Sequence, residues 1–330
     1  MASAEVYVES ELWAAERRPE GLSRVRRAVG SFARHKPLGF VCGLVVIFFM
    51  IIGDLVPETL NEGLSSIGLG RPVPYLIDVL ADDTGFVHPY GEQDLSNRLA
   101  SPSINHWLGT DQLGRDIFSR LLYGARVAVI VSFGAVVIAE AFGVVVGIAS
   151  GYYGGWLDKF AYRFVDIFQS LPNLVVLITV LGIFEPGLWQ MVLVIGLLGG
   201  PPASRLHRAQ TMAVMASPFI EAARVVGATD ARIMRVHILP NTMPLMILQS
   251  TVRLGNIVLI VAALSFIGFG LPPPFPDWGQ MLSLEGRQYM RTQPGLAIYP
   301  GVAIGILVFS FNLFGDALRD VLDPRLRGGR

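Results

Sequence analysis

Six long runs of this chain carry almost no charged side chains, and they limit its possible folds more than any other feature. A helix needs roughly 20 mostly apolar residues to cross the hydrocarbon core of a bilayer. Only helices or closed barrels satisfy every backbone polar group there, and the runs lack the alternation of barrel strands. We therefore predict an all-α, polytopic membrane protein with six transmembrane helices. The predicted spans are Leu38–Gly53, Val127–Ser150, Ile167–Phe184, Gly187–Ser204, Thr242–Gly270 and Thr292–Gly315.

The overall composition agrees with a membrane protein. Of the 330 residues, 52% are hydrophobic and 16% are charged, and the mean hydropathy is +0.52. Ordinary soluble domains are less apolar and more charged. The single cysteine, Cys42, lies in the first apolar run, and we interpret it as a buried thiol without a disulfide partner in the chain. We expect this run to be a retained anchor rather than a signal peptide, because no A-x-A cleavage site precedes Pro57.

Arginine and lysine residues set the expected orientation. Residues 1–36, which we interpret as a cytoplasmic arm, contain seven of them, and cytoplasmic segments of membrane proteins are enriched in both residue types. Six crossings return the tail, residues 321–330, to the same side, so both termini are expected in the cytoplasm. Arg115, Arg120 and Arg126 fall on the outer side in this scheme and are its exceptions.

The segments between the arm and the tail divide into three parts. Residues 37–53 form the first predicted transmembrane helix. Residues 54–123 are predicted to form an extracytoplasmic loop followed by an interfacial helix from Asp111 to Tyr123, where apolar residues recur at helical spacing. Residues 124–320 are predicted to form a five-helix membrane core that contains a polar cytoplasmic loop at residues 217–241.

This polar loop has the signals of two short helices. Ser217 is suited to cap the first helix, with Pro218 at its first position. Gly227 is suited to end it in a left-handed conformation, and Thr229 to cap the second helix. The first helix has a predicted apolar face suited to docking into a groove of another protein. That face consists of Phe219, Ala222, Ala223 and Val226, with Glu221 and Arg224 beside it.

Four separated segments resemble one family. The loop is similar to the EAA loop of ABC-type importer permeases, through Glu221, Ala222, Ala223 and Gly227 and the I-L-P run from Ile238 to Pro240. The segment from His106 to Val127, HWLGTDQLGRDIFSRLLYGARV, resembles the signature of the C-type subunit in the dipeptide, oligopeptide and nickel importers. The remaining matching segments are Leu264 to Leu282 and Phe311 to Arg327.

The resemblance implies a type I ABC importer permease fold in a bacterial or archaeal cell membrane. It implies that the chain forms half of a translocation path, favours di- or oligopeptides, and works beside a homologous B-type permease, two ABC ATPase subunits and an extracytoplasmic solute-binding protein, in contact with membrane lipid. Phe219, Glu221, Ala222, Ala223, Arg224 and Gly227 would couple it to the ATPases. The cargo could still be a dipeptide, an oligopeptide, nickel or an oligosaccharide, and the motifs identify no substrate-binding residues.

Motifs for other chemistry are missing from the sequence. The chain has only two lysines, Lys36 and Lys159, and neither lies in a phosphate-binding P-loop. We therefore expect no catalytic residues and no cofactor in this chain, with ATP and magnesium bound by the partner ATPases. The histidines lack metal-ligand spacing, so we predict no metal site in the chain. This prediction includes His88 and His106. We also expect no nucleic-acid partner.

Two charged residues inside predicted spans leave a choice open. Glu140 and Arg253 either line the translocation path, or each pairs structurally with the partner permease or reaches the membrane surface from a span end, because ionisable groups in a membrane face protein or water. An ion-driven secondary transporter is the alternative function, since intramembrane carboxylates often carry ions in that class. A membrane assembly protein without a transport path is a third possibility.

Thiol labelling tests the predicted orientation. In a Cys42→Ala background, Asp83→Cys should react with a membrane-impermeant thiol reagent in intact cells, whereas Asp230→Cys should react only after the cells are permeabilised. Labelling at position 230 from outside would invert the orientation and remove the cytoplasmic docking role of the loop.

Overall fold

The computed structural model describes residues 36–53, 87–184 and 187–322. Within these ranges the protein is helical, and the only β-type pairing is an isolated bridge between Thr110 and Asp116. The all-α prediction is confirmed for this part of the chain. Most of the predicted arm, the residues around Asp83 and most of the tail lie outside the described residues.

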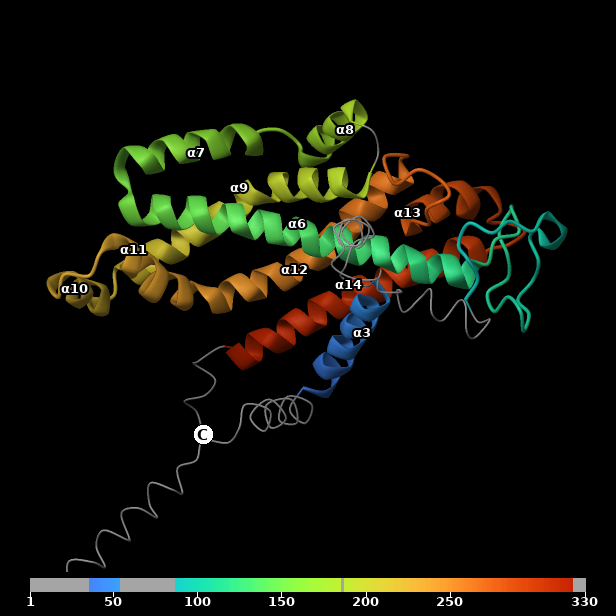
Figure 1. The fold of residues 1–330 in the computed structure, drawn as a ribbon, viewed down its shortest axis with the longest axis horizontal. Coiled ribbons are helices and arrows are strands. Elements are labelled where there is room, and N and C mark those ends of the chain that lie inside the picture. Colours follow the sequence, from blue (N-terminus) through green and yellow to red (C-terminus); the bar gives the residue numbers. More distant parts are fainter. Residues whose placement is uncertain (1–35, 54–86, 185–186, 323–330) are drawn as a thin grey trace, which may run out of the picture.

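Three described helices are long and apolar enough to cross a bilayer (Figure 1). They are α6 (Ile117–Tyr153), α14 (Gly295–Leu322), and a continuous helix made of α11 (Asp230–Arg232), the π-helical turn η2 (Ile233–Ile238) and α12 (Leu239–Phe266). They coincide with the second, sixth and fifth predicted spans.

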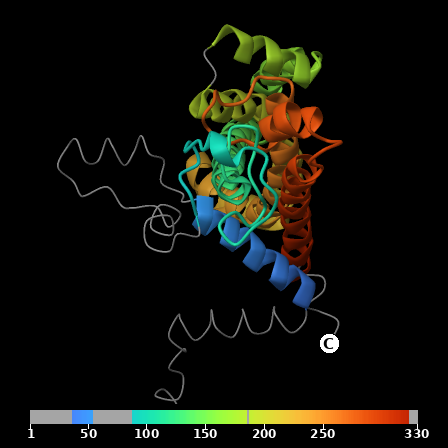
Figure 2. The same ribbon diagram turned by 90° about the vertical axis from the view of Figure 1, so that its right-hand side faces the viewer.

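Two further predicted spans are also helical. The apolar helix α3 (Pro37–Gly53) is shorter than the other three and packs against α14, as Figure 2 shows. Helix α9 (Leu188–Met215) is apolar in its first half and polar in its second. The count of six spans remains a prediction.

The third predicted span is not one helix. Helix α7 (Gly155–Gln169) ends before a break, and helix α8 (Asn173–Ile183) continues at an angle of 81°. The break coincides with Pro172, which has no N–H to donate and disfavours helical backbone at the residue before it. The prediction of a continuous helix over Ile167–Phe184 is therefore wrong at this point.

Helices α6 and α9 form the most extensive helix pair and lie side by side in Figure 1. Glycines allow this approach. A Cβ atom on Gly143 would lie 2.6 Å from the Cβ of Ala203, and one on Gly147 would lie 2.5 Å from the carbonyl oxygen of Ser204. Since lipid gives helices little hydrophobic reason to associate, close backbone packing is a main source of their attraction. The small residues of the second predicted span therefore allow close helix packing at these positions.

The chain before α6 forms turns rather than a helix. Helix α6 begins at Ile117, six residues later than the predicted interfacial helix, because the carboxylate of Asp116 caps it by accepting from the Ser119 backbone N–H at 2.7 Å. Gly114 has a φ of +75°, and a Cβ atom there would collide with the backbone of Asp94. Asp94 caps the short 3-10 helix η1 (Leu95–Asn97). The segment from Asp111 to Asp116 is therefore a turn, although its apolar residues fit the spacing of a helix.

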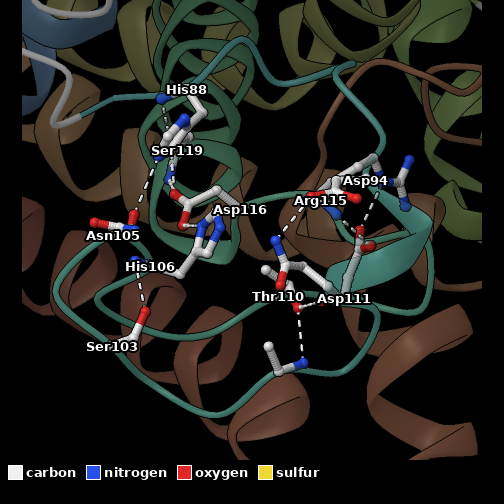
Figure 3. A network of polar contacts seen from close by, with 12 residues as sticks. His88, Asp94, Ser103, Asn105, His106, Thr110, Asp111, Arg115, Asp116 and Ser119 are labelled. Carbon is white, nitrogen blue, oxygen red and sulfur yellow. Dashed lines mark hydrogen bonds and ion pairs between the residues drawn. The ribbon is translucent and has the colours of Figure 1, made fainter.

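Four buried charged side chains join this turn to the segment between α12 and α14. Arg115 Nε lies 2.6 Å from Asp111 Oδ2, and its Nη2 lies 2.7 Å from Glu285 Oε1 (the arginine and Asp111 are shown in Figure 3). Arg120 lies 3.5 Å from Asp111 and 3.6 Å from Glu285. Glu285 belongs to the π-helical turn η3 (Leu282–Gly286), which follows α13 (Trp278–Met281). The positive charges of the two guanidinium groups thus balance the negative charges of the two carboxylates.

The charge of Glu285 holds this ion-pair network together. Burial raises the pKa of its carboxyl group, while Arg120 and Arg115 lower it. Glu285→Gln would leave two buried guanidinium groups facing only Asp111, and breaking a buried ion pair costs about 3 to 5 kcal/mol. We expect a clearly lower unfolding temperature in detergent.

The matched control for this change is Glu92→Gln. Glu92 lies in the segment before α6 and is exposed, so its replacement should change stability by less than about 0.5 kcal/mol. Equal unfolding temperatures for the two variants would contradict the role of the network.

Candidate coupling surface and transmembrane cavity

Both helices of the polar loop start where the sequence predicts, but the second is not short, because α11 continues without a break through η2 into α12. Helix α10 spans Pro218–Val225 with Pro218 in its first turn, and Gly227 follows it with a φ of +83°. The Thr229 side chain accepts from the backbone N–H of Arg232 at 3.4 Å and starts α11. One detail differs, since the Ser217 side chain makes no capping hydrogen bond.

One residue anchors α10 to the rest of the protein. Ile220 is 1% exposed and packs in a cluster with Ile148 of α6 and with Ile233 and Ile238 of the π-helical turn. Sequence reasoning missed Ile220, because it identified the helix face by its alanines and not by its largest aliphatic side chain. The anchor connects α10 to the ends of α6 and α12.

The outer face of α10 is apolar and exposed. Phe219 is 44% exposed and Val226 is 88% exposed, and Ala222 is exposed beside them. Ala223 instead packs against the isoleucine cluster. The predicted face is therefore rotated, and Val225, at 83% exposure, joins it. Exposed apolar patches of this kind are typical of protein interaction sites.

The charged residues of α10 lie at the border of this face. Glu221 is exposed, and the guanidinium of Arg224 lies 5.6 Å from the ring centre of Tyr152 on α6. The hydroxyl of Tyr152 in turn donates to Asp230 at 2.6 Å. These contacts fix the loop against α6, while α10 projects from one end of the molecule in Figure 1.

The two charged residues inside the predicted spans come together within this chain. Glu140 Oε2 lies 2.7 Å from His207 Nε2, and Glu140 Oε1 lies 3.7 Å from Arg253 Nε. Arg253 also donates to the carbonyl oxygen of Gly199 at 2.9 Å. The three ionisable groups come from α6, α9 and α12. His207 could not be predicted as the partner of Glu140, because nothing in a linear pattern relates residues on different helices.

A cavity of about 290 Å³ lies beside this triad, between α6, α8, α9 and α12. Its polar lining comes mostly from α12, through Gln249, Arg253 and Asn256, and its remaining walls are largely apolar. A second cavity of about 350 Å³ lies near the start of α6 and has aromatic walls that include Tyr90 and Tyr123. Both cavities are candidates for parts of a transport path.

Two histidines meet an aspartate at the start of α6 (Figure 3). One ligand atom each from His88, His106 and Asp116 lies within 4.8 Å of the others. His106 Nδ1 lies 3.0 Å from Asp116, and His88 Nε2 lies 3.1 Å from the carbonyl oxygen of Asn105. These hydrogen bonds account for the arrangement, because the contact of His106 with Asp116 supports the residue that caps α6. The expectation that neither histidine binds a metal remains a prediction.

Comparison with known proteins identifies the family. The family model described as binding-protein-dependent transport system inner membrane component matches residues 143–328, which include the polar loop and every residue lining the cavity of about 290 Å³ except Ala139. This chain belongs to that family. It is a multi-pass membrane protein and a permease subunit of an ABC importer with the type I permease fold. Membership excludes the ion-driven transporter and the assembly protein considered from the sequence.

Individual relatives extend the match beyond the family model. The dipeptide transport system permease protein DppC of Alkalihalophilus pseudofirmus is 41% identical over 238 residues, covering 72% of this chain and 78% of that protein. The glutathione transport system permease protein GsiD of Escherichia coli O1:K1 is 38% identical over 256 residues, covering 77% and 84%. The inward-facing MetNI methionine ABC transporter aligns with 63% of this chain and 96% of that one, at 21% identity and a TM-score of 0.48.

Gly227 offers a test of the loop geometry. A Cβ atom there would meet nothing within 4 Å, so the positive φ alone limits the residue choice. Asparagine tolerates this conformation and β-branched residues do not. We expect Gly227→Val to reduce cargo-stimulated ATP hydrolysis of the assembled importer much more than Gly227→Asn. Equal activity of the two variants would show that the left-handed turn is dispensable.

Proposed function

We propose that this chain is the C-type permease subunit of an importer for di- or oligopeptides. Its partners in this proposal are a homologous B-type permease, two ABC ATPase subunits and an extracytoplasmic solute-binding protein. ATP and magnesium are bound by the ATPase subunits. The exposed apolar face of α10, anchored through Ile220, is the observation that carries the coupling role. The names of the dipeptide and glutathione relatives support a peptide cargo.

The proposed orientation puts both termini and α10 in the cytoplasm. Arg115 and Arg120 were two of its three exceptions, because positive residues are expected mainly inside. Both arginines are paired with Asp111 and Glu285 in the buried network. Their charge is neutralised locally, so they weigh little against the orientation.

The proposed mechanism transmits motion through the isoleucine cluster. Closure of the ATPase pair moves α10, whose inner face packs on residues of α6 and of the turn that continues into α12. Because packed side chains transmit displacement, the ends of both helices move with α10. Helix α12 carries the polar lining of the transmembrane cavity. Movement at the loop thereby changes access to the cavity.

The two neighbouring alanines of α10 allow its docking role and its contribution to folding to be tested separately. Ala222 is exposed, whereas Ala223 packs against the isoleucine cluster. We expect Ala222→Asp to abolish peptide uptake and binding of the ATPase subunits while the unfolding temperature of the permease stays near that of the parent. Ala223→Asp should lower the unfolding temperature as well, because it puts a charge against apolar side chains.

Co-purification with the ATPase subunits is the measurement, and Ser101→Asp is the control. Ser101 is exposed, and it belongs to the segment before α6, which lies at the opposite end of the molecule from α10 in Figure 1. The added charge should therefore leave ATPase binding unchanged. Normal uptake and normal ATPase binding by Ala222→Asp would count against the docking role of α10.

A further inference from the structure

A polar stripe runs along the apolar helix α12. Gln249, Arg253 and Asn256 are spaced at i, i+4 and i+7, which places them on one side of the helix. All three line the transmembrane cavity of about 290 Å³. An arginine in the middle of a membrane helix costs about 2.5 to 3.5 kcal/mol on insertion scales, and such residues mark functional paths more often than lipid-facing surfaces. The stripe therefore needs an explanation beyond membrane insertion.

Arg253 has N–H donors beyond those used by its contacts in the described part of the chain. Its Nη1 donates to the Gly199 carbonyl oxygen at 2.9 Å, but its Nε lies 3.7 Å from Glu140 Oε1, which is too far for a hydrogen bond. A guanidinium group carries five N–H donors. Its side chain keeps 19% of its surface exposed. Contacts within the described part of the chain thus use only a minority of its donors.

Glu140 is fixed by a different partner. Its Oε2 bonds to the fully buried His207, and its Oε1 is buried without a hydrogen-bond partner. The carboxylate attracts Arg253 and offsets its charge, yet it does not hold the guanidinium in a bonded geometry. Arg253 is therefore stabilised in the membrane and remains available to a second anion.

We propose that this cavity binds a free carboxylate of the cargo on its way through the membrane, with Arg253 as its main partner and Gln249 and Asn256 as neutral hydrogen-bonding neighbours. The proposal rests on the peptide-import function proposed above. Guanidinium and carboxylate groups match in a two-bond geometry, which makes arginine the preferred residue for such recognition. The volume is at the lower end for ligand pockets, so the cavity suits the carboxyl-terminal end of a short peptide.

The test uses the purified importer in lipid nanodiscs, without its binding protein, so that selection by that protein plays no part. In a Cys42→Ala background, Ile260→Cys, at an apolar position that lines the cavity, reports on the cavity through its rate of thiol modification, read on this chain by mass spectrometry. Dialanine should slow the modification, and dialanine amide should require at least about tenfold more to do so, since hydrogen bonds to charged groups contribute more than neutral ones.

Arg253→Gln should remove the difference between dialanine and its amide. Because this change leaves Glu140 without its counter-charge, the double variant Glu140→Gln and Arg253→Gln serves as a second test with no unpaired buried charge. It should fold and also fail to distinguish the two peptides. Arg287→Gln, which removes an exposed arginine elsewhere, is the matched control and should behave like the parent.

Two results would overturn the proposal. One is equal protection by dialanine and its amide, or no protection by either, in the parent. The other is an undiminished preference for the free acid in the double variant. Failure of the importer function itself would look different, because the parent chain would then not purify with ATPase subunits or respond to ATP.

Discussion

The close approach of α6 and α9 is the constraint on which the rest of this structure depends. In a bilayer, helices attract one another through contact between backbones and small side chains, and Gly143 and Gly147 permit that contact against Ala203 and Ser204. The same approach brings Glu140 within bonding distance of His207. A larger residue at either glycine would separate the helices and leave the buried carboxylate without its partner.

Two sets of buried ionisable groups follow one rule, since each set joins groups from distant parts of the chain. Arg115 and Glu285 are 170 positions apart, and Glu140 and His207 are 67 apart. Burial makes an unpaired charge costly, so these pairs specify which helices must be neighbours. The network around Arg115 and Arg120 also changes how these two arginines are counted, because a neutralised charge has little influence on membrane orientation.

The sequence predicted the features that depend on neighbouring residues. Apolar runs located the long helices, and local turn chemistry located Gly227 and the cap at Thr229. The break at Pro172 was predictable by the same reasoning, yet hydropathy alone passed over it. Other features were not predictable, because they depend on how helices are rotated against one another. These are the ion pairs, the burial of Ile220, and the exposure of Ala222 beside the packed Ala223. No single-sequence pattern reports that rotation.

The length of the unbroken helix from Asp230 to Phe266 determines how far a movement of the polar loop displaces residues inside the membrane. Arg253 lies 23 residues after Asp230, or about 35 Å along a helix that rises 1.5 Å per residue. A tilt of about 10° about the loop end would displace Arg253 by about 6 Å, within the range of known helix and domain movements. Such a displacement exceeds the 3.7 Å that separates Arg253 from Glu140. A small angle at the membrane surface is therefore enough to exchange the ionic neighbours of a residue deep in the bilayer.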